Sequence, residues 1–271
     1  MTGESHWYYA DFRSRIDLLA RSLAQGLGYQ GERTHQSGED KGEPSAHLPP
    51  TAFVSYSQNH DQSGNRPFGE RLTSLAPRQA VRSLAAINIL SPHIPLLFTG
   101  EEWGAKQPFT FFSDMGEELG EKIKEGRARE FQGSPDAANG SRRPPDAMAE
   151  ETFLAAKLNW DDRSEDLHAD WLSLYRKLLR LRRDEISPRL AGIEGYAGHY
   201  EIIANRAVTV RWKLADGSVL TLIANLSPEP LDGVDVWTIG RLIWLEGIAT
   251  GTSLEPWCVV VAITDAENVA A

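Results

Sequence analysis

The sequence of 271 residues lacks the features that mark a protein for a membrane, a nucleic acid or secretion. No apolar run approaches the roughly 20 residues that a membrane-spanning helix needs. The first residues, MTGESH, show no basic region followed by an apolar segment, as a signal peptide would. Acidic residues outnumber basic ones by 38 to 28, which argues against the basic surface that binds nucleic acids and anionic membranes. We therefore expect a cytoplasmic protein with no nucleic-acid or membrane partner.

Cysteine is also nearly absent. Cys258 is the only one, which excludes an intramolecular disulfide. It lies in the apolar run 257–263, and this favours a buried, inert thiol over a reactive nucleophile, which a polar neighbour would have to activate. The HExxH, paired CxxC, phosphate-loop and dinucleotide fingerprints are missing as well. The sequence therefore implies neither a metal nor a cofactor.

What the sequence does contain is enough apolar material for a core. Hydrophobic residues make up 41% of the chain, with 8 Trp, 7 Tyr and 9 Phe, so one large domain or two smaller ones could form. Apolar residues at helical spacing predict helices over 11–27, 77–90 and 167–183. The β-forming residues at 53–56 predict one strand, and the continuously apolar segment 95–98 predicts a second strand that is buried on both faces. The two would form a βαβ unit with the helix between them.

The remaining segments follow other patterns. Residues 31–50 are expected to form a long loop, and residues 105–166 a loop insertion whose centre, 133–145, is polar and rich in helix breakers. Arg180, Arg182 and Arg183 end the third helix, where a solvated helix end is sufficient to explain them. After residue 188 the apolar residues alternate. This alternation predicts an antiparallel β region with strands at 208–214, 219–225, 241–245 and 257–263 and a hairpin turn at 216–217.

One stretch, residues 53–66, combines a predicted strand with reactive side chains. It ends in seven polar or glycine residues, 58–64, which cannot continue a buried strand without leaving polar groups unpaired. The strand would therefore deliver Asn59, His60 and Asp61 together at its carboxyl end. In α/β sheets and barrels the chemistry takes place at that end. The alternative is an ordinary exit from a strand into a solvated loop.

The motif QNHDQ at 58–62, followed by GNR at 64–66 and GERL at 69–72, resembles the last catalytic motif of the α-amylase superfamily, glycoside hydrolase family 13. Within that superfamily the sequence is most similar to the malto-oligosyltrehalose trehalohydrolase family, from Gly3 to the end of the chain. Four flanking segments fit that family in order and spacing. They are YQGE at 29–32, GEPS at 42–45, LPP at 48–50 and IPLLFTGEEWG at 94–104.

This resemblance implies a fold and an activity. The fold class would be α/β: the last part of a (β/α)8 TIM barrel over 1–188, interrupted by the loop insertion, and then a small antiparallel β-sandwich domain over 189–271. The family hydrolyses the α-1,4-glucosidic bond next to the terminal trehalose of maltooligosyl-trehalose and releases trehalose, with retention of configuration. The implied partner is maltooligosyl-trehalose or a related α-glucan.

The resemblance also assigns site residues. Asp61 would stabilise the oxocarbenium-like transition state, because a carboxylate interacts more strongly as positive charge builds on the sugar. His60 would hydrogen-bond sugar hydroxyl groups beside it. The other substrate-binding candidates are Asn59, Gln62, Ser63, Gly64, Asn65, Glu102 and Trp103.

Two groups of rim residues leave alternatives open. Of Glu101 and Glu102, one is expected to face the substrate while the other has a structural role, although both could be structural. The aromatic residues of this region could form a sugar-stacking wall or a part of the core. They are Trp103, Phe109, Phe111 and Phe112.

Some family features are missing from the sequence. The nucleophile and acid/base motifs of the family lie on earlier strands, and no stretch between residues 1 and 53 resembles them. We therefore expect a fragment or a truncated gene product that is inactive alone. The alternative function is an inactive remnant with at most weak glucan binding, whereas an unrelated α/β protein would leave the other ordered matches unexplained. Gln36 and Ser37 also stand where relatives have an aromatic or basic pair, which bears on how the trehalose end would be gripped.

Overall fold

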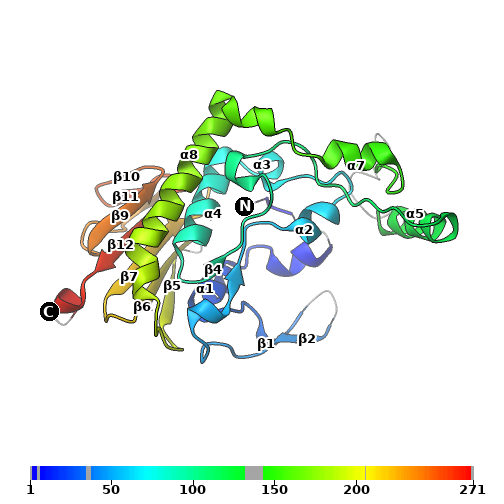
Figure 1. The fold of residues 1–271 in the computed structure, drawn as a ribbon. Coiled ribbons are helices and arrows are strands. Elements are labelled where there is room, and N and C mark those ends of the chain that lie inside the picture. The colour runs from blue at the N-terminus through cyan, green and yellow to red at the C-terminus, as the bar shows by residue number, and fades with distance from the viewer. Residues whose placement is uncertain (1, 5–6, 35–37, 132–142, 205, 270–271) are drawn as a thin grey trace. The chain divides into compact units, whose positions relative to one another are not determined.

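The computed structural model describes residues 2–4, 7–34, 38–131, 143–204 and 206–269. Its chain forms two compact units, labelled by element in Figure 1. The first unit comprises Met1–Ser55, Pro77–Leu96 and Tyr175–Ala271, and the second comprises Tyr56–Ala76 and Leu97–Leu174. The predicted domain boundary between residues 188 and 189 stays a prediction.

A five-stranded antiparallel sheet forms the centre of the first unit, in the order β5-β6-β7-β12-β9. The predicted hairpin is present: Gly217 has a φ of 84°, and Asp216 Oδ1 accepts a hydrogen bond of 3.0 Å from the Ser218 amide. The four predicted strands are confirmed, and β5, an edge strand, is additional. The bounds are β5 Gly198–Ile203, β6 Ala207–Lys213, β7 Val219–Asn225, β9 Arg241–Glu246 and β12 Val259–Thr264.

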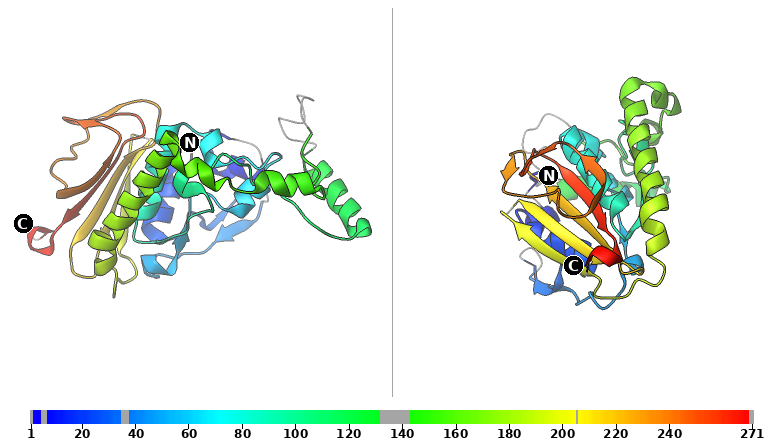
Figure 2. Two further views of the ribbon diagram at one scale, coloured as in Figure 1. Left: turned by 45° about the horizontal axis from the view of Figure 1, so that its top comes forward. Right: turned by 90° about the vertical axis from the view of Figure 1, so that its left-hand side faces the viewer.

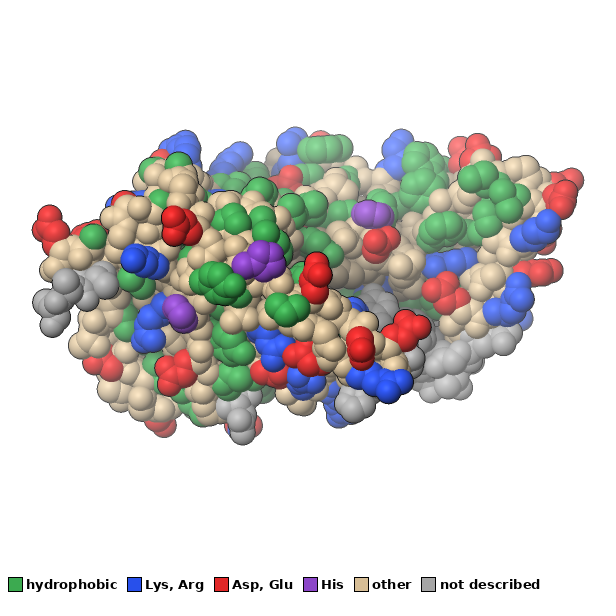
Figure 3. All heavy atoms as spheres, turned by 90° about the horizontal axis from the view of Figure 1, so that it is seen from below, with side chains coloured by type: hydrophobic (Ala, Val, Ile, Leu, Met, Phe, Trp, Pro, Cys, Tyr) green, Lys and Arg blue, Asp and Glu red, His purple; other side chains and the backbone are tan. Residues whose placement is uncertain are grey.

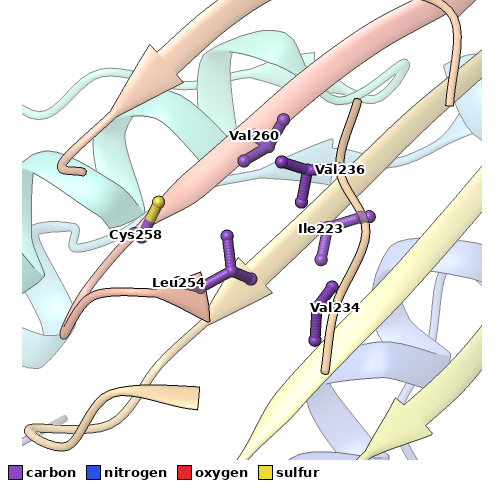
Figure 4. Packing of buried hydrophobic residues seen from close by; sticks show 6 residues of the cluster. All are labelled: Ile223, Val234, Val236, Leu254, Cys258 and Val260. Carbon is purple, nitrogen blue, oxygen red and sulfur yellow. The ribbon is translucent and has the colours of Figure 1, made fainter. Parts of the chain in front are cut away.

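A second, three-stranded sheet completes the predicted β-sandwich, in the order β10-β11-β8. Its strands are β8 Leu231–Asp232, β10 Ala249–Thr250 and β11 Ser253–Leu254. Leu254 of β11 packs with Ile223 of β7 and Val260 of β12 in a buried cluster that also contains Cys258 (Figure 4). The prediction of a buried cysteine is confirmed, and burial raises the pKa of the Cys258 thiol to about 12, as expected of an unreactive thiol.

Two helices cover the other face of the five-stranded sheet (Figure 2). Helix α1, Ile16–Gln25, packs on β5 and β6, and α4, Arg78–Leu90, packs on β9 and β12. The indole Nε1 of Trp212 donates a hydrogen bond of 3.0 Å to the Leu23 carbonyl and joins β6 to α1. Helix α1 is shorter than predicted, because a separate 3-10 helix, η1 Trp7–Phe12, precedes it.

The predicted βαβ unit is present. Strands β3, Val54–Ser55, and β4, Ile94–Pro95, pair in parallel and are connected through α4. The prediction that the second strand is buried on both faces is wrong, because Leu96 is 40% exposed. Val54 and Ile94 are exposed as well, at 54% and 49%. The reason is that no third strand among the described residues pairs with either of them.

Arg182 corrects another prediction. It begins a π-helical turn, η5 Arg182–Ile186, after helix α8, Asp166–Leu181. Its guanidinium donates to the Ile89 carbonyl at 2.8 Å, to the His93 carbonyl at 2.7 Å and to the Ser91 carbonyl, and burial lowers its pKa to about 10. The end of α4 leaves carbonyl groups without helical partners, and Arg182 satisfies them. Of the neighbouring arginines, Arg183 does lie exposed, paired with Asp184.

The segment 31–50 contains a hairpin where a loop was predicted. Strands β1, Gln30–Arg33, and β2, Asp40–Gly42, pair antiparallel, and a 3-10 helix, η2 Pro50–Ala52, follows. The expected departure from the family at Gln36 and Ser37 lies outside the described residues.

The second unit consists of helices and extended segments. The described part of the predicted loop insertion at 105–166 includes the helices α5 and α7, which the sequence did not reveal, because few of their residues are apolar and buried. Most of the expected loop 133–145 lies outside the described residues. The elements are α2 His60–Gly64, α3 Leu72–Leu75, η3 Glu101–Trp103, α5 Glu117–Phe131, α7 Glu150–Ala156, η4 Trp160–Ser164 and the start of α8.

Two further observations concern the surface. No helix in the described ranges is long and apolar enough to cross a membrane. On the face shown in Figure 3, acidic and basic side chains are interspersed among hydrophobic ones, without an extended basic patch.

Candidate active site

The polar motif after β3 forms a short helix, α2, where a loop was expected. Asn59 is its N-cap: the side-chain Oδ1 accepts a hydrogen bond of 3.1 Å from the Gln62 amide. Gln62 Oε1 in turn accepts one of 2.9 Å from the Asn59 amide, which completes a capping box. Both side-chain carbonyl oxygens therefore serve the helix. Substrate binding by Asn59 and Gln62 stays a prediction.

His60 and Asp61 occupy the first turn of α2 and point away from the core. Each side chain is 70% exposed, and His60 Nε2 lies 3.4 Å from Asp61 Oδ1. The amino-terminal end of a helix favours a carboxylate, because the peptide dipoles place partial positive charge there. The two residues with the strongest predicted roles are thus adjacent and accessible.

The rest of α2 has a different environment. Ser63 and Gly64 are buried, and the backbone amide of Asn65 donates a hydrogen bond of 2.9 Å to the Asp61 carbonyl. A side chain at position 64 would lie 3.9 Å from the ring of Phe109. Ser63 and Gly64 therefore form the packed side of the helix, and their predicted contact with substrate remains a prediction, like that of the exposed Asn65.

Arg71 connects the segments around α2, a role that the sequence did not predict. Its Nε donates to the Gln107 carbonyl at 2.6 Å and its Nη1 to the Thr99 carbonyl at 2.7 Å, while the guanidinium lies 5.0 Å from the Phe98 ring centroid. Burial lowers the pKa of Arg71, whereas the nearby carboxylate of Glu101 acts to raise it. The signal was present, since Arg71 belongs to the GERL motif, but nothing in the pattern distinguished it from a solvated arginine.

The two rim glutamates differ in burial. Glu101 is buried, and its Oε2 accepts a hydrogen bond of 3.2 Å from the Phe98 amide, whereas Glu102 is only half-buried. This difference agrees with the expectation that one of them has a structural role. Whether Glu102 contacts a sugar stays a prediction.

Trp103 lies in the core of the second unit. It is 2% exposed, and its ring lies 5.0 Å from that of Trp160, centroid to centroid. Its carbonyl oxygen is 2.6 Å from Nδ1 of the buried His168. A sugar could stack on Trp103 only after a movement of its neighbours, so the predicted substrate contact would require such a movement.

The remaining aromatic residues form a row of edge-to-face contacts. Phe98 and Phe109 lie 5.1 Å apart, Phe109 and Phe112 6.4 Å, and Phe112 and Phe153 5.1 Å, measured between ring centroids. Phe98 is buried, whereas Phe112 and Phe111 are exposed. The row therefore begins in the core and ends at the surface, and only its outer members are accessible to a sugar.

This arrangement agrees with the prediction that His60 and Asp61 form part of a glycosidase site, which stays a prediction. An exposed carboxylate beside an imidazole can stabilise positive charge on a sugar and hydrogen-bond its hydroxyl groups. A retaining glycosidase also needs a nucleophile and an acid/base carboxyl group on either side of the bond. Within the described ranges, no group of three or more His, Cys, Asp or Glu side chains is arranged to hold a metal ion.

Curated proteins that are similar to this chain include malto-oligosyltrehalose trehalohydrolases. The malto-oligosyltrehalose trehalohydrolase of Deinococcus radiodurans is 44% identical over 187 residues, which are 68% of this chain and 31% of that protein. The protein of the same name from Mycobacterium tuberculosis is 32% identical over 237 residues, which are 85% of this chain and 38% of that protein. A domain of unknown function, DUF3459, matches residues 196–261.

A solved structure is also similar. The crystal structure of a putative α-amylase from Salmonella typhimurium superposes with a TM-score of 0.89 at 38% identity, covering 97% of this chain and 44% of that one. This similarity confirms the predicted fold class. The chain spans only about a third of the length of the curated relatives, 31% and 38% in the two cases above. The chain therefore belongs to the α-amylase superfamily, glycoside hydrolase family 13, as a relative of the malto-oligosyltrehalose trehalohydrolases.

Proposed function

We propose that residues 1–271 form the carboxy-terminal portion of a retaining malto-oligosyltrehalose trehalohydrolase. In this proposal the enzyme cleaves the α-1,4 bond next to the terminal trehalose of maltooligosyl-trehalose and releases trehalose. The observation that carries it is the pair His60 and Asp61, exposed and adjacent at the start of α2, within a chain whose relatives bear that name.

Each member of the pair has a role in this mechanism. As the glycosidic bond breaks, positive charge develops on the sugar, and the Asp61 carboxylate interacts with it more strongly than with the ground state. The imidazole of His60 hydrogen-bonds sugar hydroxyl groups and orients the ring beside Asp61. The nucleophile and the acid/base would come from outside residues 1–271.

The same proposal gives β3 and β4 a place in a larger sheet. They would be neighbouring strands of a (β/α)8 barrel, in which parallel strands are buried on both faces. The exposed side chains Val54, Ile94 and Leu96 would then be covered by strands or helices outside this chain.

A non-catalytic function is the second candidate. A remnant with weak glucan binding would fit the absence of nucleophile and acid motifs between residues 1 and 53. The two candidates differ in one simple observation: the first requires coding sequence upstream of Met1 and in frame with it.

The experiment uses a hybrid hydrolase, in which residues 1–271 are joined to the part of the Deinococcus radiodurans relative that the comparison leaves unmatched. In it, Asp61→Asn should lower kcat by about 10²–10³, or about 3–4 kcal/mol, because one aligned transition-state charge is lost. The change is nearly isosteric, so KM should change much less.

The matched control is Asp166→Asn, since Asp166 is also an exposed aspartate in the first turn of a helix. It should leave kcat unchanged. A hybrid with Asp61→Asn that retained near-normal turnover would remove Asp61 from the catalytic set.

A further inference from the structure

Arg127 of helix α5 reaches the carboxyl end of α2. Its Nη2 donates a hydrogen bond of 2.9 Å to the Gly64 carbonyl, and its Nη1 pairs with the Glu130 carboxylate at 3.1 Å. The guanidinium carbon lies 5.0 Å from the ring centroid of Phe111 and 4.5 Å from that of Phe131. Both α2 and α5 belong to the second unit, so this contact joins two helices of one compact body.

The environment of Arg127 is unusual for an arginine on a charged helix. Its side chain is only 17% exposed, and burial lowers its pKa. A guanidinium is planar and more weakly hydrated than an ammonium, so it can be packed against aromatic rings while it still donates hydrogen bonds. The two phenylalanine rings therefore restrict where the group lies, and the Gly64 carbonyl receives a donor of fixed direction.

Helix α2 needs such a contact. It has five residues, and an isolated helix of that length is not stable in water. The capping box of Asn59 and Gln62 satisfies its amino-terminal end, but the last carbonyl groups of a helix also lack helical partners. Arg127 supplies a charged donor at that end, which is also the favourable end for a cation.

We propose that Arg127 is a positioning residue that holds α2, and with it His60 and Asp61, in the orientation that the reaction requires. The effect on turnover rests on the function proposed above, whereas the effect on α2 itself does not. Arg127 touches neither reacting side chain, so it acts only through the backbone of the helix that carries them.

The test compares Arg127→Met, Arg127→Lys and the control Arg129→Met in the hybrid hydrolase. Methionine keeps a long side chain but cannot donate a hydrogen bond. The exposed Arg129 lies on the same helix, and its Nε donates to the Glu125 carbonyl. Amide hydrogen exchange is followed in peptides covering 58–66 and 117–131. The kinetic constants kcat and KM are measured on maltooligosyl-trehalose.

We expect Arg127→Met to speed exchange in 58–66 while exchange in 117–131 stays close to that of the parent. It should lower kcat by roughly 10- to 100-fold, because a misplacement of about 1 Å is sufficient for such a loss. Arg127→Lys should restore part of kcat, since an ammonium can reach the carbonyl but cannot reproduce the planar stacking. Arg129→Met should change neither quantity.

Three results would overturn the proposal. One is unchanged exchange in 58–66 in the Arg127→Met hybrid. Another is an unchanged kcat despite faster exchange there, provided that Asp61→Asn lowers turnover. The third is equally faster exchange in 117–131, which would mean that Arg127 stabilises α5 and not the position of α2. If Asp61→Asn has no effect on turnover while Arg127→Met speeds exchange in 58–66, then Arg127 does stabilise the position of α2 and the proposed function is wrong.

Discussion

At the scale of single residues, burial separates the side chains of the motif by role. His60 and Asp61 are exposed, whereas Gln58 is buried and its Oε1 accepts a hydrogen bond of 3.0 Å from the Leu72 amide. The motif therefore combines residues that build the local structure with two that face solvent. The sequence pattern alone could not make this distinction, because all of these residues are polar.

His60→Ala in the hybrid hydrolase should lower both kcat and the apparent affinity for substrate. The melting temperature should hardly change, since substitutions at exposed positions usually alter stability by no more than about 0.5 kcal/mol. Steady-state kinetics measure the effect on kcat and affinity, and thermal unfolding measures the effect on the melting temperature. A loss of several degrees with intact activity would make the histidine structural.

A second histidine gives a prediction on pH. His93 is buried with its ring 6.2 Å from that of Phe53, and burial, assisted by the nearby Arg182, lowers its pKa to about 4. In the unfolded chain its pKa is about 6.5, so the unfolded state binds more protons between pH 6.5 and 4. The first unit is then fully stabilised by this residue above pH 6.5 and loses that contribution as the pH falls toward 4.

The free energy of local unfolding around His93 should therefore fall by up to about 3 kcal/mol between pH 6.5 and 4, because each unit of pKa difference corresponds to about 1.4 kcal/mol. Amide exchange of residues 89–96 in the hybrid hydrolase, corrected for intrinsic exchange rates, measures how this free energy changes with pH between pH 7 and 4. His93→Gln, which cannot titrate, should remove most of the slope. An equal slope in that variant would contradict the assignment.

At the scale of elements, the hydrogen bonds of Arg182 join η5 to the end of α4 within the first unit. Removing the Arg182 side chain would leave buried carbonyl groups without donors, at a cost of about 1–3 kcal/mol for a buried polar group left unsatisfied. Arg182→Ala should therefore speed exchange in 87–96 of the hybrid hydrolase. Arg183→Ala is the control, because its ion pair with Asp184 is exposed to solvent, and exposed pairs contribute little to stability. Equal effects of the two substitutions would show that Arg182 is not a special contact.

The elements that sequence could predict are those with a clear period. Helix α4 and the hairpin β6-β7 follow from apolar residues at helical and alternating spacing, and the structure agrees to within a residue or two. Helix α5 shows no such signal, because only Gly120 and Phe131 are buried along it. Helix α2 is too short to show a period at all.

The candidate site was predictable in part for a similar reason. His60 and Asp61 were found by their resemblance to a motif. Such a resemblance identifies the residues with a chemical role, but not the residues that hold them in place. Arg71 and Arg127 donate to carbonyl groups that lie far away in the sequence, at Thr99 and Gly64. No local pattern indicates such partners. The same applies to Arg182, which local charge alone placed in solvent.

At the scale of the whole molecule, the two-stranded sheet of β3 and β4 is the part of the structure expected to be least stable. Two parallel strands cannot close into a barrel, and the smallest filled barrels of this kind have about eight. Burial of apolar surface contributes about 25 cal/mol per Å², against a typical net stability of about 5–15 kcal/mol. A chain that leaves Val54, Ile94 and Leu96 exposed therefore lacks stabilisation that the rest of a barrel would supply.

We accordingly expect residues 1–271 expressed alone neither to fold as a stable monomer nor to release trehalose. The free edges of β3 and β4 should favour aggregation or capture by a partner. The antiparallel β domain has its own buried cluster between two sheets and should survive limited proteolysis as a carboxy-terminal piece that begins near residue 189. A soluble monomer with a single cooperative unfolding transition would contradict the folding half.

The most direct measurement is trehalose release from maltooligosyl-trehalose by the purified chain and by the hybrid hydrolase, side by side. We predict no release by residues 1–271 alone, release by the hybrid, and a loss of about 10²–10³ in turnover when the hybrid carries Asp61→Asn. Trehalose release by the chain alone would show that its catalytic carboxylates lie within residues 1–271, and would contradict the assignment of Asp61 as one member of a site completed from outside the chain.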